Sequence, residues 1–215
     1  YKFKLDKTHV AFRDQIEKGV PFNTPSGKIE IFSTQLAGIT DWKRTQYGEP
    51  IPYLPKWIEP FESLNHPLAK KFPFHLITPH PRERTHSIYH NIAWLRETCQ
   101  QEITLNASDA ASLGVKTGDV VEVFNDRGRC VVPVYVTERC MPKVAVLYEG
   151  AWMDIDKNGV DRAGNPDFLT ADEPSPAGAF AYNTILVNIR KTDLVHRPGW
   201  DELSAARSHV FRRDQ

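Results

Sequence analysis

The stretch "VKTGDVVEVFNDRGRCVVPVYVT", residues 115–137, indicates the fold more clearly than any other part of the sequence. Apolar residues dominate on both sides of the tetrapeptide Asn-Asp-Arg-Gly, whose residue types favour a tight turn. We therefore expect a β-hairpin with strands at 120–124 and 129–137. Pro133 has no backbone N–H to donate within the second strand, so we expect an edge or a bulge at this position.

Short strands are also expected on both sides of this hairpin. Their apolar segments are 74–78, 143–150 and 183–191. The segment 104–115, "TLNASDAASLGV", is typical of a short helix that Asn106 or Ser108 would cap and Gly114 would end. Several short strands with one brief helix predict a chain that is mainly β with short helices. They favour a closed β-barrel over a sandwich or a βαβ sheet.

The N-terminal part of the chain has a different character. A short helix is expected within residues 1–20, followed by an alternating strand that contains Ile29 and Ile31. The stretch 47–67 is then interrupted by prolines, which exclude a regular helix and make a central strand improbable. Its aromatic residues, which include Tyr53, Trp57 and Phe61, are too many for a free linker. We therefore expect an extended, proline-rich arm that packs on another surface.

These patterns divide the chain into three parts. Residues 1–70 form the arm and the connection from a preceding domain, and residues 71–191 form the barrel. Residues 192–215 form a polar C-terminal tail, rich in Arg. Because the chain does not begin with Met, we expect it to be a piece of a longer protein.

The bulk composition excludes several classes of function. The formal net charge is zero, which gives no support to binding of nucleic acid or of anionic membranes. No apolar run approaches the roughly twenty residues of a membrane span, so no direct membrane insertion is expected. The three cysteines include no C-x-x-C pair, and this argues against an iron–sulfur or zinc site made by this chain alone.

The sequence "TPHPRERTHSIYHN", residues 78–91, follows the first barrel strand and leaves three alternatives open. These are a metal site, an anion-binding loop and a polar surface turn. His86 and His90 are four residues apart, as in helical zinc sites, but no Glu stands beside the first of them. Arg82 and Arg84 would place positive charge beside a metal cation, which disfavours the metal site.

An anion-binding loop fits these residues better. The two arginines offer forked donors suited to phosphate, and His80 and His86 add further donors. Ser87 and Asn91 would hydrogen-bond a ligand or cap a following helix; taken alone, capping is the more common role for these residue types.

Five motifs together resemble a known family. In chain order they are "TPSGKIEIFS", "HPRERTHSIYHN", "LNASDAASLGVKTGDVVEVFNDRGR", "MPKVAVLYEGAW" and the closing strand. They are similar to the C-terminal part of molybdopterin oxidoreductases of the dimethyl sulfoxide reductase family, and closest to the catalytic subunits of anaerobic S-oxide reductases. The resemblance runs from about Phe22 to Lys191.

The resemblance implies a double-psi β-barrel that holds molybdopterin guanine dinucleotide, the molybdenum cofactor of the family. It places cofactor-binding roles on six residues: His80, Arg84, His86, Ser87, Asn183 and Thr184. Arg84 would neutralise the diphosphate, and His90 is expected on the surface or in a following helix. Relatives carry Gly-Asn upstream of the last strand, where this chain has Gly178 and Ala179.

The resemblance also implies what this chain does not supply. The molybdenum ligand and the iron–sulfur cysteines belong to upstream domains, so no catalytic residue and no metal ligand is expected here, and the isolated fragment is expected to be inactive. The implied partners are the rest of the catalytic subunit, an iron–sulfur electron-transfer subunit and a membrane anchor subunit, in a periplasmic complex attached to the membrane. The implied reaction is oxygen-atom transfer in anaerobic respiration, with S-oxides, N-oxides and selenate as alternative acceptors.

A role from a different class remains open. The barrel and the arm would then serve as a structural or assembly domain, docking the catalytic subunit to neighbouring domains or to an electron-transfer subunit. The aromatic residues between 53 and 61 and the basic tail motivate this alternative.

Overall fold

The computed structural model describes residues 8–38, 51–173 and 180–197. The chain divides into two compact units, residues 1–58 and residues 59–215. The stretch 59–70, which the sequence assigned to the arm, thus belongs to the same unit as the barrel. The Gly178–Ala179 pair and most of the expected C-terminal tail lie outside the described residues.

The first unit contains two short helices, α1 (Arg13–Glu17) and α2 (Thr34–Ala37). α1 confirms the helix expected within residues 1–20. The strand expected around Ile29 and Ile31 is wrong, because both side chains are exposed and this segment forms no ladder with another described segment. An alternating pattern produces a strand only where a neighbouring strand and a core are present, and this segment has neither.

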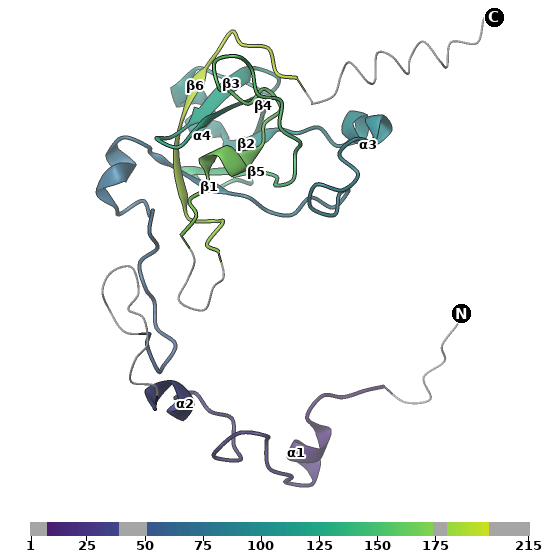
Figure 1. Ribbon diagram of the computed structural model, residues 1–215, viewed down its shortest axis with the longest axis vertical. Coiled ribbons are helices and arrows are strands. Elements are labelled where there is room, and N and C mark those ends of the chain that lie inside the picture. Colours follow the sequence, from purple (N-terminus) through teal and green to yellow (C-terminus); the bar gives the residue numbers. More distant parts are fainter. Residues whose placement is uncertain (1–7, 39–50, 174–179, 198–215) are drawn as a thin grey trace, which may run out of the picture. The chain divides into compact units, whose positions relative to one another are not determined.

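The second unit is a closed barrel of six strands, which confirms the expected mainly β class (Figure 1). The strands are β1 (Phe74–Ile77), β2 (Ile103–Asn106), β3 (Val120–Phe124), β4 (Arg129–Thr137), β5 (Val144–Leu147) and β6 (Ile185–Lys191). Around the barrel the order is β1, β5, β2, β4, β3 and β6. The pairs β1–β5 and β2–β4 are parallel, and the other neighbours are antiparallel.

The β3–β4 hairpin lies where the sequence predicts it. The Asn125 backbone N–H donates to the Gly128 carbonyl, and the Asn125 side-chain oxygen accepts from the Arg127 backbone N–H at 2.9 Å. Pro133 is paired with Val120 of β3, one residue before the pairing of β4 with β2 begins. Pro133 therefore lies at a position where β4 is paired with β3 but not with β2.

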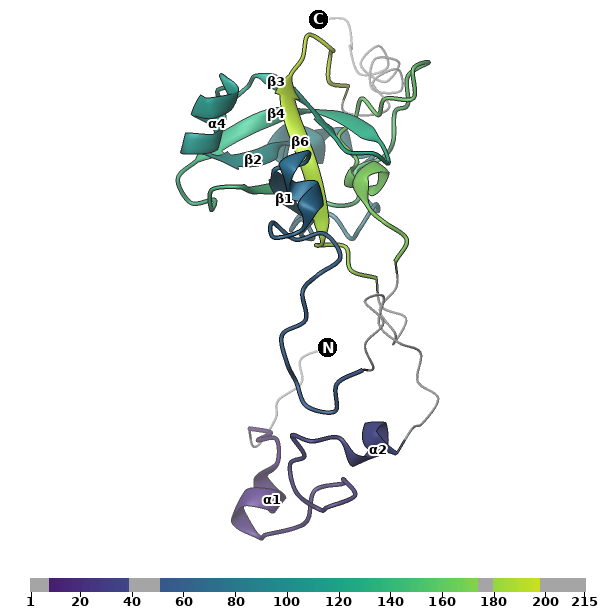
Figure 2. The same ribbon diagram turned by 90° about the vertical axis from the view of Figure 1, so that its left-hand side faces the viewer.

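Short helices complete the second unit. They are η1 (Pro67–Lys70), α3 (Ala93–Thr98), α4 (Ala107–Leu113) and η2 (Pro166–Leu169). α4 packs on the barrel beside β2 and β4 (Figure 2). The Asn106 side chain caps it by accepting from the Ser108 backbone N–H, and Gly114 ends it in the left-handed conformation, as expected. Within the described ranges, no helix is long and apolar enough to cross a membrane.

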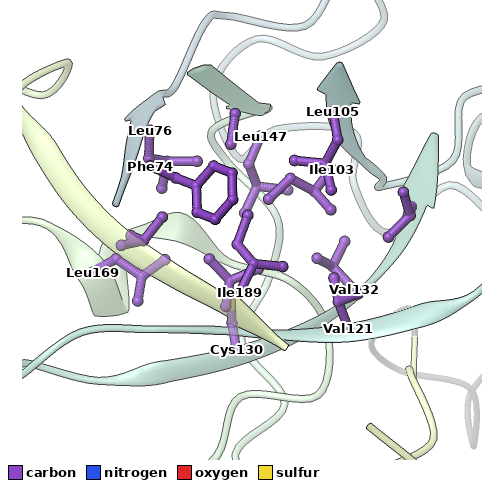
Figure 3. Packing of buried hydrophobic residues seen from close by; sticks show 14 of the residues in the cluster. Phe74, Leu76, Ile103, Leu105, Val121, Cys130, Val132, Leu147, Leu169 and Ile189 are labelled. Atoms are coloured by element: carbon purple, nitrogen blue, oxygen red, sulfur yellow. The ribbon is translucent and has the colours of Figure 1, made fainter. Parts of the chain in front are cut away.

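The sequence pattern does not predict a strand directly before α4, but residues 103–106 form β2. Ile103 and Leu105 are fully buried, so this short strand places alternate side chains in the core. Figure 3 shows apolar side chains from the surrounding strands and from η2 packed together in the core. Those labelled are Phe74, Leu76, Ile103, Leu105, Val121, Cys130, Val132, Leu147, Leu169 and Ile189.

A partly buried ion pair attaches the stretch before β1 to the barrel. Glu62 is 8% exposed, and its carboxylate accepts from the Arg127 guanidinium of the hairpin turn. The same carboxylate accepts from the backbone N–H of Leu186 in β6 at 2.7 Å. One side chain therefore joins three segments that are far apart in the sequence.

We expect Glu62→Gln to lower the free energy of unfolding by about 1–3 kcal/mol. The amide retains one acceptor oxygen, and it leaves the Arg127 guanidinium without its bidentate partner. Chemical unfolding monitored by circular dichroism would measure the change. Glu138→Gln is the control, since Glu138 is exposed after β4; equal stability of the two variants would contradict the role given to Glu62.

Candidate functional site

The barrel topology brings the predicted site residues to one end. β1 and β5 are parallel, with Ile77 opposite Val146, so the segments that follow both strands leave the barrel together. β6 is antiparallel to β1, with Leu76 opposite Ile185, so the segment that precedes β6 reaches the same end. Segments 78–92, 148–152 and 180–184 therefore meet here.

Asn183 is joined directly to the end of β1. Its side-chain oxygen accepts from the Thr78 backbone N–H at 2.8 Å, and the Thr78 hydroxyl donates to the Tyr182 carbonyl. Thr184 closes the turn before β6, where its hydroxyl donates to the Ala181 carbonyl at 2.8 Å. Asn183 is exposed, whereas Thr184 is partly covered. The structure thus brings both residues to the start of the histidine loop.

The histidine loop is residues 79–90, and it is fixed against the segment that follows β5. The Glu149 backbone N–H donates to the Pro79 carbonyl, and the Trp152 indole N–H donates to the Ser87 carbonyl at 2.7 Å. Gly150 has φ +81°, and a Cβ atom on it would lie 2.1 Å from the His86 carbonyl oxygen. Only a glycine allows the two backbones to approach this closely.

Arg84 is buried and donates into the protein. It is 8% exposed, and its Nη2 donates to the Gln101 side chain at 3.0 Å and to the Glu149 carbonyl at 2.8 Å. Burial lowers the pKa of the Arg84 guanidinium, while the charges of Glu83 and Glu149 act in the opposite direction. An arginine nevertheless stays protonated in proteins, so Arg84 is a buried cation that joins the loop to the segments before β2 and after β5.

His90 is also buried, and the expectation that it lies on the surface or in a helix is wrong. It is 2% exposed, and its Nδ1 lies 3.0 Å from Nη1 of Arg84. α3 begins only at Ala93, with Ile92 as its N-cap residue, so neither Ser87 nor Asn91 caps it. The proline-containing loop keeps its irregular backbone because Arg84 and His90 anchor it inside.

His80, His86 and Glu149 form a polar cluster at the exposed face of the loop. The His86 backbone N–H donates to Nε2 of His80 at 3.1 Å, and Nδ1 of His86 lies 2.8 Å from a Glu149 carboxylate oxygen. The two imidazole rings meet edge to face, with centroids 4.9 Å apart. Ser87 follows His86 and is exposed.

Donor atoms of these three residues lie within 4.8 Å of one another, a grouping that could hold a metal ion. Hydrogen bonds within the cluster already use His86 Nδ1 and His80 Nε2, so the side chains satisfy one another without a cation. We do not assign them as metal ligands.

A cavity of about 260 Å³ lies on the other side of Arg84. Its lining carries both arginines and acids, namely Arg84 and Arg96 with Glu83 and Glu102. This balance of charge gives the cavity no preference for an anion, so the exposed end of the barrel is the better candidate for binding one.

The residues that the sequence did not single out for this site are Thr78, Glu149, Gly150 and Trp152. The last three belong to the motif "YEGAW" directly after β5. In the sequence, Gly150 follows a predicted strand and lies between a carboxylate and an aromatic residue. Such a glycine often indicates that two backbone segments approach each other closely. The partner of that approach depends on the barrel topology.

We expect Gly150→Ala to displace the histidine loop and to lower the free energy of unfolding by at least about 3 kcal/mol. The added methyl group meets the His86 carbonyl and also strains the backbone. Gly159→Ala is the matched control, since Gly159 has φ +72° and open space around it. It should cost only about 1–2 kcal/mol.

Chemical unfolding of both variants measures this difference. Two equal losses of stability would show that the approach of Gly150 to His86 has no energetic consequence.

Comparisons with known proteins agree with this geometry. The family model described as "Molydopterin dinucleotide binding domain" matches residues 74–185. Dimethyl sulfoxide reductase DmsA of Escherichia coli (strain K12) is 42% identical over 182 residues, covering 84% of this chain and 22% of that protein. Trimethylamine-N-oxide reductase 1 of the same strain is 38% identical over 194 residues, covering 85% and 22%.

One solved structure shows the same fold. Acetylene hydratase from Pelobacter acetylenicus gives a TM-score of 0.63 at 21% identity, over 82% of this chain and 25% of that one. The chain spans about a fifth of the length of the curated relatives it matches. The six described strands form one barrel, and the family model matches more than half of the residues. The chain therefore belongs to the molybdopterin dinucleotide-binding domain family.

Proposed function

We propose that this chain is the cofactor-binding domain of a longer molybdenum oxidoreductase subunit that reduces S-oxides or N-oxides. The observation that carries the proposal is the convergence of the histidine loop and Asn183 at one end of a barrel that belongs to this family. The names of the relatives, dimethyl sulfoxide reductase and trimethylamine-N-oxide reductase, support the choice of acceptors.

The residues at this end fit a ligand with several hydrogen-bonding groups. His80, His86, Ser87 and Asn183 are exposed and offer both donors and acceptors. The non-consecutive parallel pairs β1–β5 and β2–β4 support the assignment of the barrel to the double-psi type. When bound, molybdopterin guanine dinucleotide supplies the oxygen-atom transfer chemistry. The role of this chain is to hold and orient it.

In this proposal the site residues have different roles. His80, His86, Ser87 and Asn183 contact the ligand, and Thr184 shapes the turn that carries Asn183. Arg84 acts from inside, because both its terminal nitrogens already have partners in the protein. Neutralisation of the diphosphate then falls to Arg82, which is exposed on the same loop.

Further features of the proposal concern the intact protein. The proline-containing stretch before the barrel unit, residues 51–58, serves as an arm that packs against a neighbouring domain, and the exposed Trp57 supports such a contact. The proposed partners are the rest of the catalytic subunit, an iron–sulfur electron-transfer subunit and a membrane anchor subunit.

We expect His86→Ala in the intact subunit to weaken cofactor binding about tenfold, because one hydrogen bond to the ligand is lost. Molybdenum and guanine nucleotide per polypeptide, measured at limiting cofactor, report the effect. His9→Ala, an exposed histidine of the first unit, is the control. Full molybdenum and nucleotide content in the His86 variant would refute its role in binding.

A further inference from the structure

Glu149 is a carboxylate at an end of the barrel where an anionic ligand is proposed. One of its oxygens lies 2.8 Å from Nδ1 of His86 and 3.9 Å from Nε2 of His80. Its side chain is 27% exposed, and its backbone is fixed at both ends by bonds to Pro79 and Arg84. A negative charge here would repel an anion, so its place beside the histidines requires another explanation.

The contact with Glu149 fixes the proton of His86. An ionised carboxylate only accepts hydrogen bonds, so the nitrogen beside it carries the hydrogen. A neutral imidazole has one N–H, and Nε2 of His86 is then an acceptor. Glu149 therefore decides which nitrogen of His86 can accept from a ligand.

The bond from the loop backbone fixes His80 in a similar way. Its Nε2 accepts from the His86 backbone N–H at 3.1 Å, so the hydrogen of neutral His80 lies on Nδ1. The two rings are in edge-to-face contact, with their centroids 4.9 Å apart. Together the pair offers one donor, His80 Nδ1, and one acceptor, His86 Nε2.

We propose that Glu149 is a positioning residue that holds His86 as an acceptor beside the donor of His80, and that this pair binds the edge of a heterocycle where an N–H adjoins a carbonyl. The inference rests on the proposed function, in which this end of the barrel holds the cofactor. Both the pterin and the guanine of such a cofactor carry an edge of this kind. Glu149 itself need not touch the ligand.

The proton positions can be measured without any ligand. Long-range ¹H–¹⁵N correlation spectra of the ¹⁵N-histidine-labelled chain, recorded where both imidazoles are neutral, distinguish the two tautomers. We expect Nδ1–H in His86 of the wild type and in Glu149→Gln, whose amide oxygen still accepts. We expect Nε2–H, the form that imidazole prefers in water, in Glu149→Ala. Glu138→Gln is the control at an exposed position beyond β4.

Either of two results overturns the inference: Nε2–H in wild-type His86, or Nδ1–H that persists in Glu149→Ala. A role of Glu149 in stability alone would not change the tautomer, and rescue by Glu149→Gln separates the proton effect from the loss of the side chain.

Calorimetry with pterin and with guanosine tests whether the chain binds a heterocycle with such an edge. It also shows which of the two heterocycles is bound. We expect one of them to bind the chain, and Glu149→Ala to weaken that binding about tenfold. Adenosine, which lacks an N–H beside a carbonyl, is expected not to bind. Equal binding of adenosine would overturn the recognition of that edge. If neither pterin nor guanosine binds while the tautomers are as expected, the proposed ligand fails together with the proposed function, and the positioning of His86 by Glu149 stands.

Discussion

The candidate site depends on the hydrogen bonds that the buried guanidinium of Arg84 makes inside the protein. Removing a cation from water is costly unless its donors find partners, and the Gln101 side chain, the Glu149 carbonyl and the His90 ring provide partners for its two terminal nitrogens. These partners belong to the loop itself and to the segments before β2 and after β5. The histidine loop is interrupted by prolines and has no regular hydrogen-bonding ladder. The buried side of the loop holds it in one conformation, and His86 and Ser87 remain exposed on its other side.

The barrel provides the second constraint, because it decides which segments meet. A parallel pair such as β1 and β5 releases its two following loops at the same end, and the antiparallel β6 begins there. Residues more than a hundred positions apart, such as Thr78 and Asn183, become hydrogen-bonding partners in this way. The close approach of Gly150 to His86 completes the arrangement, since a side chain at that position would separate the two backbones.

Local patterns predicted much of the barrel but little of what lies around it. The β3–β4 hairpin, β1, β6 and the cap of α4 all follow from turn chemistry and apolar runs within a few residues. β2 was not predicted, because four residues carry too little periodicity, and the strand forms through its pairing with β4 and β5. The inward positions of Arg84 and His90 could not be predicted either. Whether a charged residue in a loop faces solvent depends on acceptors that come from other segments, here Gln101 and Glu149.

The same contacts change the electrostatic character expected of this end of the barrel. A loop with two arginines and three histidines suggests a strongly cationic clamp, yet one arginine and one histidine are buried and a carboxylate lies beside the other two histidines. What remains at the surface is mainly a set of directional donors and acceptors, with Arg82 as the exposed cation of the loop. Such a surface selects a ligand by the pattern of its hydrogen-bonding groups more than by its total charge. For a dinucleotide, the heterocycle would then supply the specificity, and the diphosphate would be balanced by Arg82 and by charges that other parts of the intact protein provide.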